Sequence, residues 1–119
     1  MIHHVGYEVR SLERSAQFYD AVFFALGGRR LYESREAIGW GIDQPVFWVT
    51  ARALPKAGYG HVALHASGRA AVDGAYEAGT AAGGTDDGPP GDRPEYGPTY
   101  YAAYMRDPDG LKVEVVAGA

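Results

Sequence analysis

The sequence predicts an α+β protein built from two copies of a strand–helix–strand–strand–strand (βαβββ) module. The same order of patterns occurs twice within 119 residues, and equivalent features are separated by a nearly constant distance. His4 and His61 stand near the start of the two alternating segments and are 57 residues apart. Gly27 and Gly83, which follow the two helical patterns, are 56 residues apart. Such a repeat indicates a duplicated structural unit.

The first module begins with a strand at about residues 3–9, where apolar residues alternate with polar residues or glycine. Ser11 is a suitable N-cap for a helix predicted near 11–26, which ends at two glycines. The apolar residues of this helix recur every three or four positions, as expected for one buried side: Leu12, Ala16, Tyr19, Val22, Phe23 and Leu26. Three short strand-like segments complete the module, at 29–34, 37–41 and 46–50.

The second module repeats this order. Another alternating segment predicts a strand at 60–66, and a helix near 70–82 follows it. The last two strands are predicted at 99–106 and 111–116, around an Asp-Pro-Asp-Gly sequence that suits a type I turn. We therefore expect a single domain with the following parts: module one at about 1–52, a linker at about 53–59 and module two at about 60–119.

One segment breaks the symmetry between the modules. Residues 83–98 contain five glycines and four prolines, a composition that resists regular structure. Unstructured loops of this length are uncommon inside compact domains and often have a function. A lid over a binding site and an excursion without a role are both open interpretations.

Composition excludes several classes of protein. The net charge is −4, with 11 Lys and Arg against 15 Asp and Glu, which argues against a nucleic-acid partner. The absence of cysteine excludes a disulfide scaffold, a thiolate zinc site and a cysteine nucleophile. The longest strictly apolar run, Ala21 to Leu26, is far too short to cross a membrane, and the first residues lack a signal-peptide core. We expect a cytoplasmic protein that has no membrane partner.

Three motifs carry a family resemblance that covers almost the whole chain. They are His4-Val5-Gly6-Tyr7-Glu8-Val9, Gly60-His61-Val62-Ala63-Leu64 and Asp107-Pro108-Asp109-Gly110-Leu111-Lys112-Val113-Glu114. Together they resemble the vicinal oxygen chelate superfamily, which contains glyoxalase I, bleomycin-resistance proteins, fosfomycin-resistance thiol transferases and extradiol dioxygenases. The resemblance implies two βαβββ modules that form an open, curved mixed sheet around a cavity.

The resemblance also implies a metal site. The ligand positions of the family fall on His4, His61 and Glu114 of this sequence. Two imidazoles and one carboxylate leave coordination positions open, through which a substrate can bind by two neighbouring oxygens. The fourth family position holds Trp48, which can neither bind a metal nor carry a proton, and this disfavours glyoxalase I activity. We expect one divalent ion, and the sequence does not distinguish Mn, Fe, Ni or Zn.

Two functions from different classes follow from this resemblance. The first is a metal-dependent lyase, dioxygenase or transferase that acts on a small oxygen-rich molecule. The alternative is a metal-free protein that sequesters a ligand, as in the bleomycin-resistance branch. The candidate substrate-binding residues are Trp48, Arg93, Tyr101 and Tyr104. The resemblance further implies a homodimer with a shared cavity, and the 13% aromatic content suits such an interface. Pairing of the two modules within one chain, as in some members of the family, is the open alternative.

Overall fold

The computed structural model describes residues 3–53 and 61–119. The first module contains five elements: β1 (Val5–Glu8), α1 (Leu12–Ala25), β2 (Arg29–Glu33), β3 (Ala37–Gly41) and β4 (Pro45–Thr50). Its strands form one sheet in the order β1-β4-β3-β2, in which β1 and β4 are parallel and the other pairs are antiparallel.

The second module contains six elements: β5 (His61–His65), α2 (Arg69–Ala81), β6 (Thr85–Asp86), β7 (Gly91–Asp92), β8 (Tyr101–Arg106) and β9 (Lys112–Ala117). Its sheet has the order β5-β9-β8-β6, and β7 also pairs with β8. Strands β5 and β9 are parallel, as β1 and β4 are in the first sheet. The predicted α+β class with two βαβββ modules is confirmed, and the predicted helices differ from α1 and α2 by one residue at each end. Most of the predicted linker, from residue 54 onward, lies outside the described residues.

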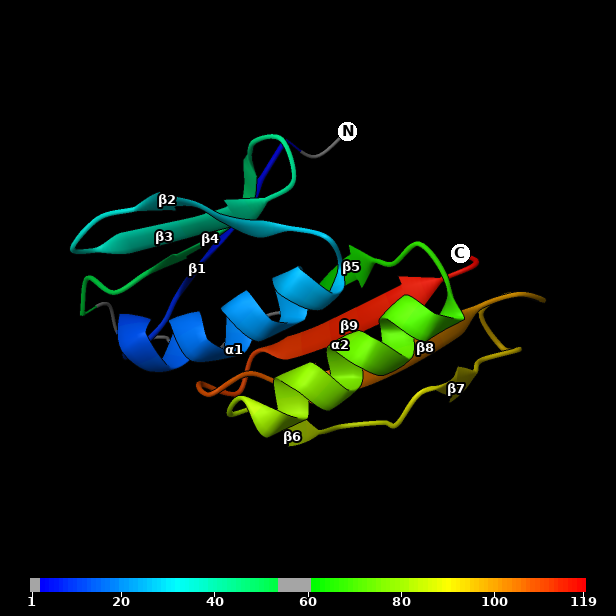
Figure 1. The fold of residues 1–119 in the computed structure, drawn as a ribbon. Coiled ribbons are helices and arrows are strands. Elements are labelled where there is room, and N and C mark those ends of the chain that lie inside the picture. Colours follow the sequence, from blue (N-terminus) through cyan, green and yellow to red (C-terminus); the bar gives the residue numbers. More distant parts are fainter. Residues whose placement is uncertain (1–2, 54–60) are drawn as a thin grey trace.

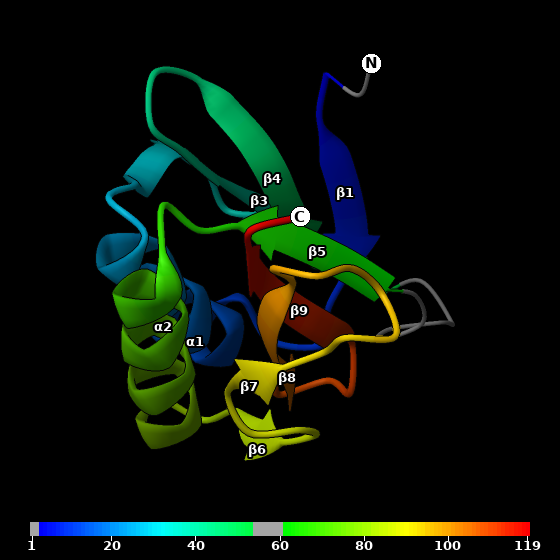
Figure 2. The same cartoon turned by 90° about the vertical axis from the view of Figure 1, so that its right-hand side faces the viewer.

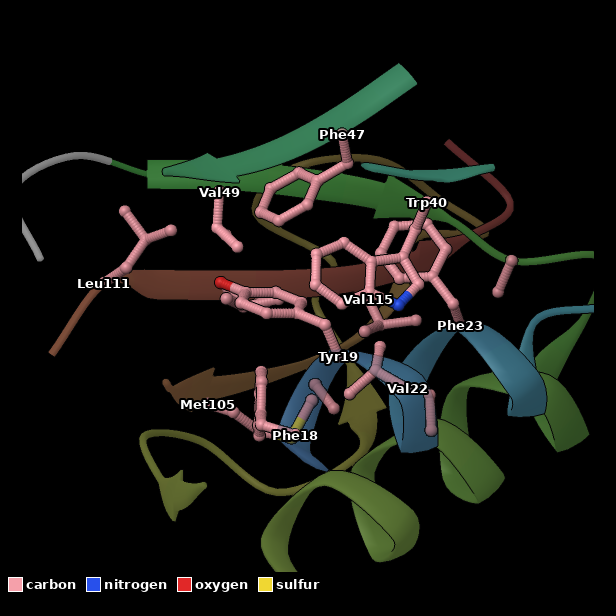
Figure 3. Packing of buried hydrophobic residues seen from close by; sticks show 14 of the residues in the cluster. Phe18, Tyr19, Val22, Phe23, Trp40, Phe47, Val49, Met105, Leu111 and Val115 are labelled. Carbon is pink, nitrogen blue, oxygen red and sulfur yellow. The ribbon is translucent and has the colours of Figure 1, made fainter. Parts of the chain in front are cut away.

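The two modules share one hydrophobic core. Helix α1 packs beneath the first sheet, α2 packs on the second sheet, and the two helices lie side by side (Figure 1). Tyr19 of α1 lies against Phe47 of β4, with ring centroids 4.6 Å apart, and Phe23 stacks on Trp40 of β3 (Figure 3). The same cluster continues into the second sheet through Met105 and other buried residues of β8 and β9. Neither sheet therefore has a core of its own.

The segment 83–98 is more regular than its composition predicts. Its two short strands pair with β8, where Asp86 lies opposite Met105 and Asp92 lies opposite Tyr101. Asp86 accepts a hydrogen bond from Tyr76 of α2, so the segment is also attached to the helix. The sequence gives no sign of these strands because two residues are too few for an alternating pattern. The segment forms a fixed border along β8 (Figure 2).

The Asp-Pro-Asp-Gly turn between β8 and β9 is attached to the first module. The Oδ1 atom of Asp107 accepts hydrogen bonds from the backbone amides of Asp109 and Leu111, at 2.9 and 2.8 Å. Its Oδ2 atom accepts a hydrogen bond of 3.0 Å from the hydroxyl of Tyr19 on α1. Gly110 has a φ of 92°, which favours glycine at this position. Asp107 thus shapes the turn and links it to α1.

The N-cap predicted for the first helix is present in the structure. Ser11 accepts a hydrogen bond from the amide of Arg14 at the start of α1, as the N-cap prediction requires. Helix α2 begins after Gly68, which offers no side chain for this purpose. Among the described residues, no helix has the length and apolar composition needed to cross a membrane.

Tyr19→Phe should lower the free energy of unfolding by about 1–3 kcal/mol, because it leaves the buried Oδ2 of Asp107 without its donor. Urea unfolding monitored by circular dichroism measures this change. Tyr76→Phe is the matched control, since it removes a similar hydroxyl-to-carboxylate bond at the surface. An equal decrease in the free energy of unfolding of the two variants would show that the buried Tyr19–Asp107 bond contributes no more to stability than the surface bond.

Asp107 should also make stability depend on pH. Burial raises the pKa of the Asp107 carboxyl above its ordinary 3.8. The folded protein then holds this proton more tightly than the unfolded chain, so stability falls as the pH rises from about 3.8 through the raised pKa. Asp107→Asn removes this titration and keeps an oxygen for the turn amides. The free energy of unfolding of the wild type, relative to that of the variant, should fall with pH across this window in urea titrations. A difference that stays constant or rises with pH would contradict the assignment.

Candidate metal and substrate site

A buried carboxylate and an imidazole meet on the open face of the second sheet. Glu114 lies at the centre of β9, opposite Ala63 of β5 and Tyr104 of β8. Because side chains alternate along a strand, Val113 and Val115 enter the core while Glu114 faces the other side. Glu114 is nevertheless only 4% exposed. Its Oε1 atom lies 3.3 Å from Nε2 of His61, whose side chain is 51% exposed.

Two tyrosines flank the carboxylate. The hydroxyl of Tyr100 donates a short hydrogen bond to Oε2 of Glu114. This bond, together with burial and the negative charge of Glu114, raises the pKa of Tyr100 well above its ordinary value. Burial, and next the charge of Glu114, raises the pKa of Tyr104 as well. Both hydroxyls therefore stay protonated at neutral pH and act as hydrogen-bond donors beside Glu114.

These groups line a pocket of about 440 Å³ that the second module builds by itself. The lining residues come from β5, β8, β9 and the segment before β8: His61, Asp87, Gly88, Arg93, Glu95, Tyr96, Tyr100, Tyr104, Lys112 and Glu114. The segment 83–98 thus supplies one wall of the site.

Two cations lie close to one ring in this pocket wall. The guanidinium carbon of Arg93 is 5.3 Å from the centroid of the Tyr104 ring, and Nζ of Lys112 is 5.0 Å from it. An Nη2–H of Arg93 donates to the carbonyl of Pro89 at 2.6 Å, which holds the guanidinium to the border segment. Asp87 offers its carboxylate to Lys112 at 3.7 Å. The positive charge of the wall is therefore partly balanced by an acidic neighbour.

His4 does not join this pocket. It lies before β1 and lines a separate hollow of about 530 Å³ on the first sheet, together with Tyr32 and Trp48. Tyr7, three residues later and on the other side of β1, donates a hydrogen bond of 3.1 Å to the backbone carbonyl of His61. The start of β1 stands at the opposite end of the molecule from β6 and β7 (Figure 2). Within residues 3–53 and 61–119, no three His, Asp or Glu side chains are grouped so that they could hold a metal ion.

Trp48 and Glu114 occupy equivalent places in the register of the two sheets. Trp48 lies opposite Gly6, two residues after His4, and Glu114 lies opposite Ala63, two residues after His61. The Trp48 indole lies close over the next strand, because a Cβ at Gly39 would come within 3.1 Å of two of its ring atoms. The first module thus carries a flat aromatic surface where the second carries its carboxylate.

The donor atoms of His61 and Glu114 suit neighbouring positions on one metal ion. Ligands that lie roughly 2.1 Å from an ion and at right angles to each other are about 3 Å apart. The observed separation of 3.3 Å is close to this value. The pair could therefore provide two of the three predicted ligands, while His4, the third, lines a different pocket.

A model of the Glyoxalase/Bleomycin resistance protein/Dioxygenase superfamily matches residues 1–115. The chain belongs to this superfamily. A solved structure of a glyoxalase/bleomycin resistance protein from Albidiferax ferrireducens T118 is 32% identical, and the alignment covers 98% of each chain with a TM-score of 0.88.

More distant members of the superfamily share the fold. FosX, a fosfomycin resistance protein from Mesorhizobium loti, is 24% identical, with a TM-score of 0.70 over all of this chain and 92% of its own. A lactoylglutathione lyase from Agrobacterium tumefaciens is 20% identical, with the same TM-score over 99% of this chain and 93% of its own. A search of curated proteins finds no match.

The predicted substrate-binding residues divide between different places in this glyoxalase-superfamily fold. Arg93 and Tyr104 line the pocket with Glu114, and Trp48 lies on the first sheet with His4. Tyr101 is on the other face of β8, where its hydroxyl donates a hydrogen bond of 2.7 Å to Asp73 of α2. We therefore place it outside the site.

Sequence analysis missed the role of Tyr100. It differs from Tyr104 by four positions, so the two side chains fall on one face of an extended chain. That parity was the available signal. Applied to Tyr104, it selects Tyr100 in place of the predicted Tyr101.

Proposed function

We propose that this protein is a divalent-metal-dependent enzyme that acts on a small molecule through two neighbouring oxygens. The observation that carries the proposal is the approach of Glu114 Oε1 and His61 Nε2 to 3.3 Å at one polar pocket. A buried carboxylate beside an imidazole is costly to desolvate, and a shared cation would compensate that cost.

The third ligand in this proposal is the partner's His4 in a homodimer. Within one chain, His4 and Glu114 line different pockets on different sheets. If the open face of the first sheet of one copy covers the open face of the second sheet of the other, the two hollows become one cavity. Both faces then become buried. The exposed side chains of Tyr32 and Val46 would contribute apolar surface of the first sheet to that contact.

The residues of the chain have separate tasks in the proposed reaction. A bound divalent ion would act as a Lewis acid toward substrate oxygens. Tyr100 donates its hydroxyl hydrogen bond to Glu114, whereas Tyr104 keeps its proton and can donate a hydrogen bond to a bound oxygen atom. Arg93 and Lys112 place positive charge along the same wall. Trp48 offers a surface for packing and no proton transfer, so a proton-shuttling isomerisation of the glyoxalase I kind is disfavoured.

His61→Ala should abolish the binding of Mn²⁺ or Zn²⁺ while leaving the metal-free fold intact, since the imidazole is half exposed and packs little. Isothermal titration and thermal shift measure this, because an ion that binds only the folded state raises its stability. His65→Ala is the matched control: it removes an imidazole from the same strand that lines a different pocket. A wild-type protein that binds no divalent ion would favour the alternative, a metal-free protein that sequesters its ligand.

Mixing His4→Ala with Glu114→Ala protein should restore metal binding in part. In a two-fold dimer with shared sites, each mixed dimer regains one intact site, so random exchange restores about one quarter of the wild-type sites. Equilibrium dialysis counts the bound ions, and mass spectrometry confirms the exchange. If exchange occurs and no binding returns, each chain forms its metal site without a residue of the partner.

A further inference from the structure

The two oxygens of Glu114 have different partners. Oε1 faces His61 Nε2, while Oε2 accepts the hydroxyl hydrogen of Tyr100. An oxygen that already accepts a hydrogen bond from a hydroxyl has one lone pair engaged and less freedom to turn toward a cation. Of the two carboxylate oxygens, Oε1 is therefore the one available to bind a cation.

Tyr100 is itself held firmly. Its carbonyl accepts a hydrogen bond of 2.8 Å from the amide of Arg93, across the border segment. Its ring lies against that of Tyr96, with centroids 5.4 Å apart. The preceding Thr99 donates a hydrogen bond of 2.8 Å from its hydroxyl to the carbonyl of Gly118, just after β9. The hydroxyl of Tyr100 is thus fixed relative to the strand that carries Glu114.

We infer that Tyr100 is a positioning residue that restricts Glu114 to a single coordinating oxygen. This inference rests on the proposed function, because it concerns the metal that Glu114 and His61 would hold. The hydrogen bond reserves Oε2 and leaves Oε1, the atom beside His61, as the metal ligand.

The coordination mode decides how many positions stay open. An octahedral ion such as Mn²⁺ with three single-atom protein ligands keeps about three positions for water or substrate. If both oxygens of Glu114 bind, about two remain. A substrate that binds through two oxygens would then displace every water. Tyr100 would thereby keep one position free for a further molecule beside the substrate.

The test counts water molecules on Mn²⁺ bound to the wild type and to Tyr100→Phe, using water-proton relaxation after stoichiometric loading. The variant removes one oxygen atom and keeps the ring contact with Tyr96. We expect the number of exchangeable waters to fall from about three to about two, with Mn²⁺ still bound. Tyr101→Phe is the matched control, since it removes a hydroxyl-to-carboxylate bond at the next residue, whose side chain lies on the opposite face. It should keep the wild-type hydration.

Three results would overturn the inference, and they can be told apart. Unchanged hydration in Tyr100→Phe means that Tyr100 does not set the coordination mode, while the proposed metal site stands. Loss of Mn²⁺ binding in a folded Tyr100→Phe variant contradicts a carboxylate that gains a second coordinating oxygen. A wild-type protein that binds no Mn²⁺, Fe²⁺, Ni²⁺ or Zn²⁺ removes both the proposed function and this inference.

Discussion

The buried hydrogen bond between Tyr19 and Asp107 is the constraint on which the rest of the molecule depends. Asp107 stands between β8 and β9, and its other oxygen fixes the turn that joins them. The turn sets the register of β9, and a slip by one residue would send Glu114 into the core and a valine to the site. Through Tyr19 the same carboxylate joins this register to α1, and so to the aromatic core of the first sheet.

A second contact also links the Asp-Pro-Asp-Gly turn to the first module. Arg10, which follows β1, donates from its Nε to Asp109 at 2.7 Å. Both aspartates of the Asp-Pro-Asp-Gly turn are buried, and both are bound by residues of the first module. The Asp-Pro-Asp-Gly turn is therefore a connection between the modules, and it contributes to the site by placing β9.

Much of this architecture can be predicted from local patterns. The duplication, both helices and the facing of His61 and Glu114 follow from glycine positions and from alternation along strands. The separation of His4 from Glu114 could not be predicted in this way, because alternation fixes the face of a strand and says nothing about where one sheet lies relative to another. The structure also places Tyr101, another predicted site residue, on the face of β8 that looks toward Asp73 of α2. Its face depends on where β8 begins to pair, and the pairing partner includes β7, which is too short to leave a pattern.

The two tryptophans give the molecule an optical property of its own. Trp40 is completely buried and donates its indole N–H to Asp20 at 2.8 Å, whereas Trp48 lies on the open first sheet beside Tyr32. Their emission should therefore separate into a shielded component and a component that a dissolved quencher reaches. Because Trp48 shares its hollow with His4, the accessible component reports on whatever covers that face. Intrinsic fluorescence can thus follow the arrival of a second copy or a small molecule without any attached label.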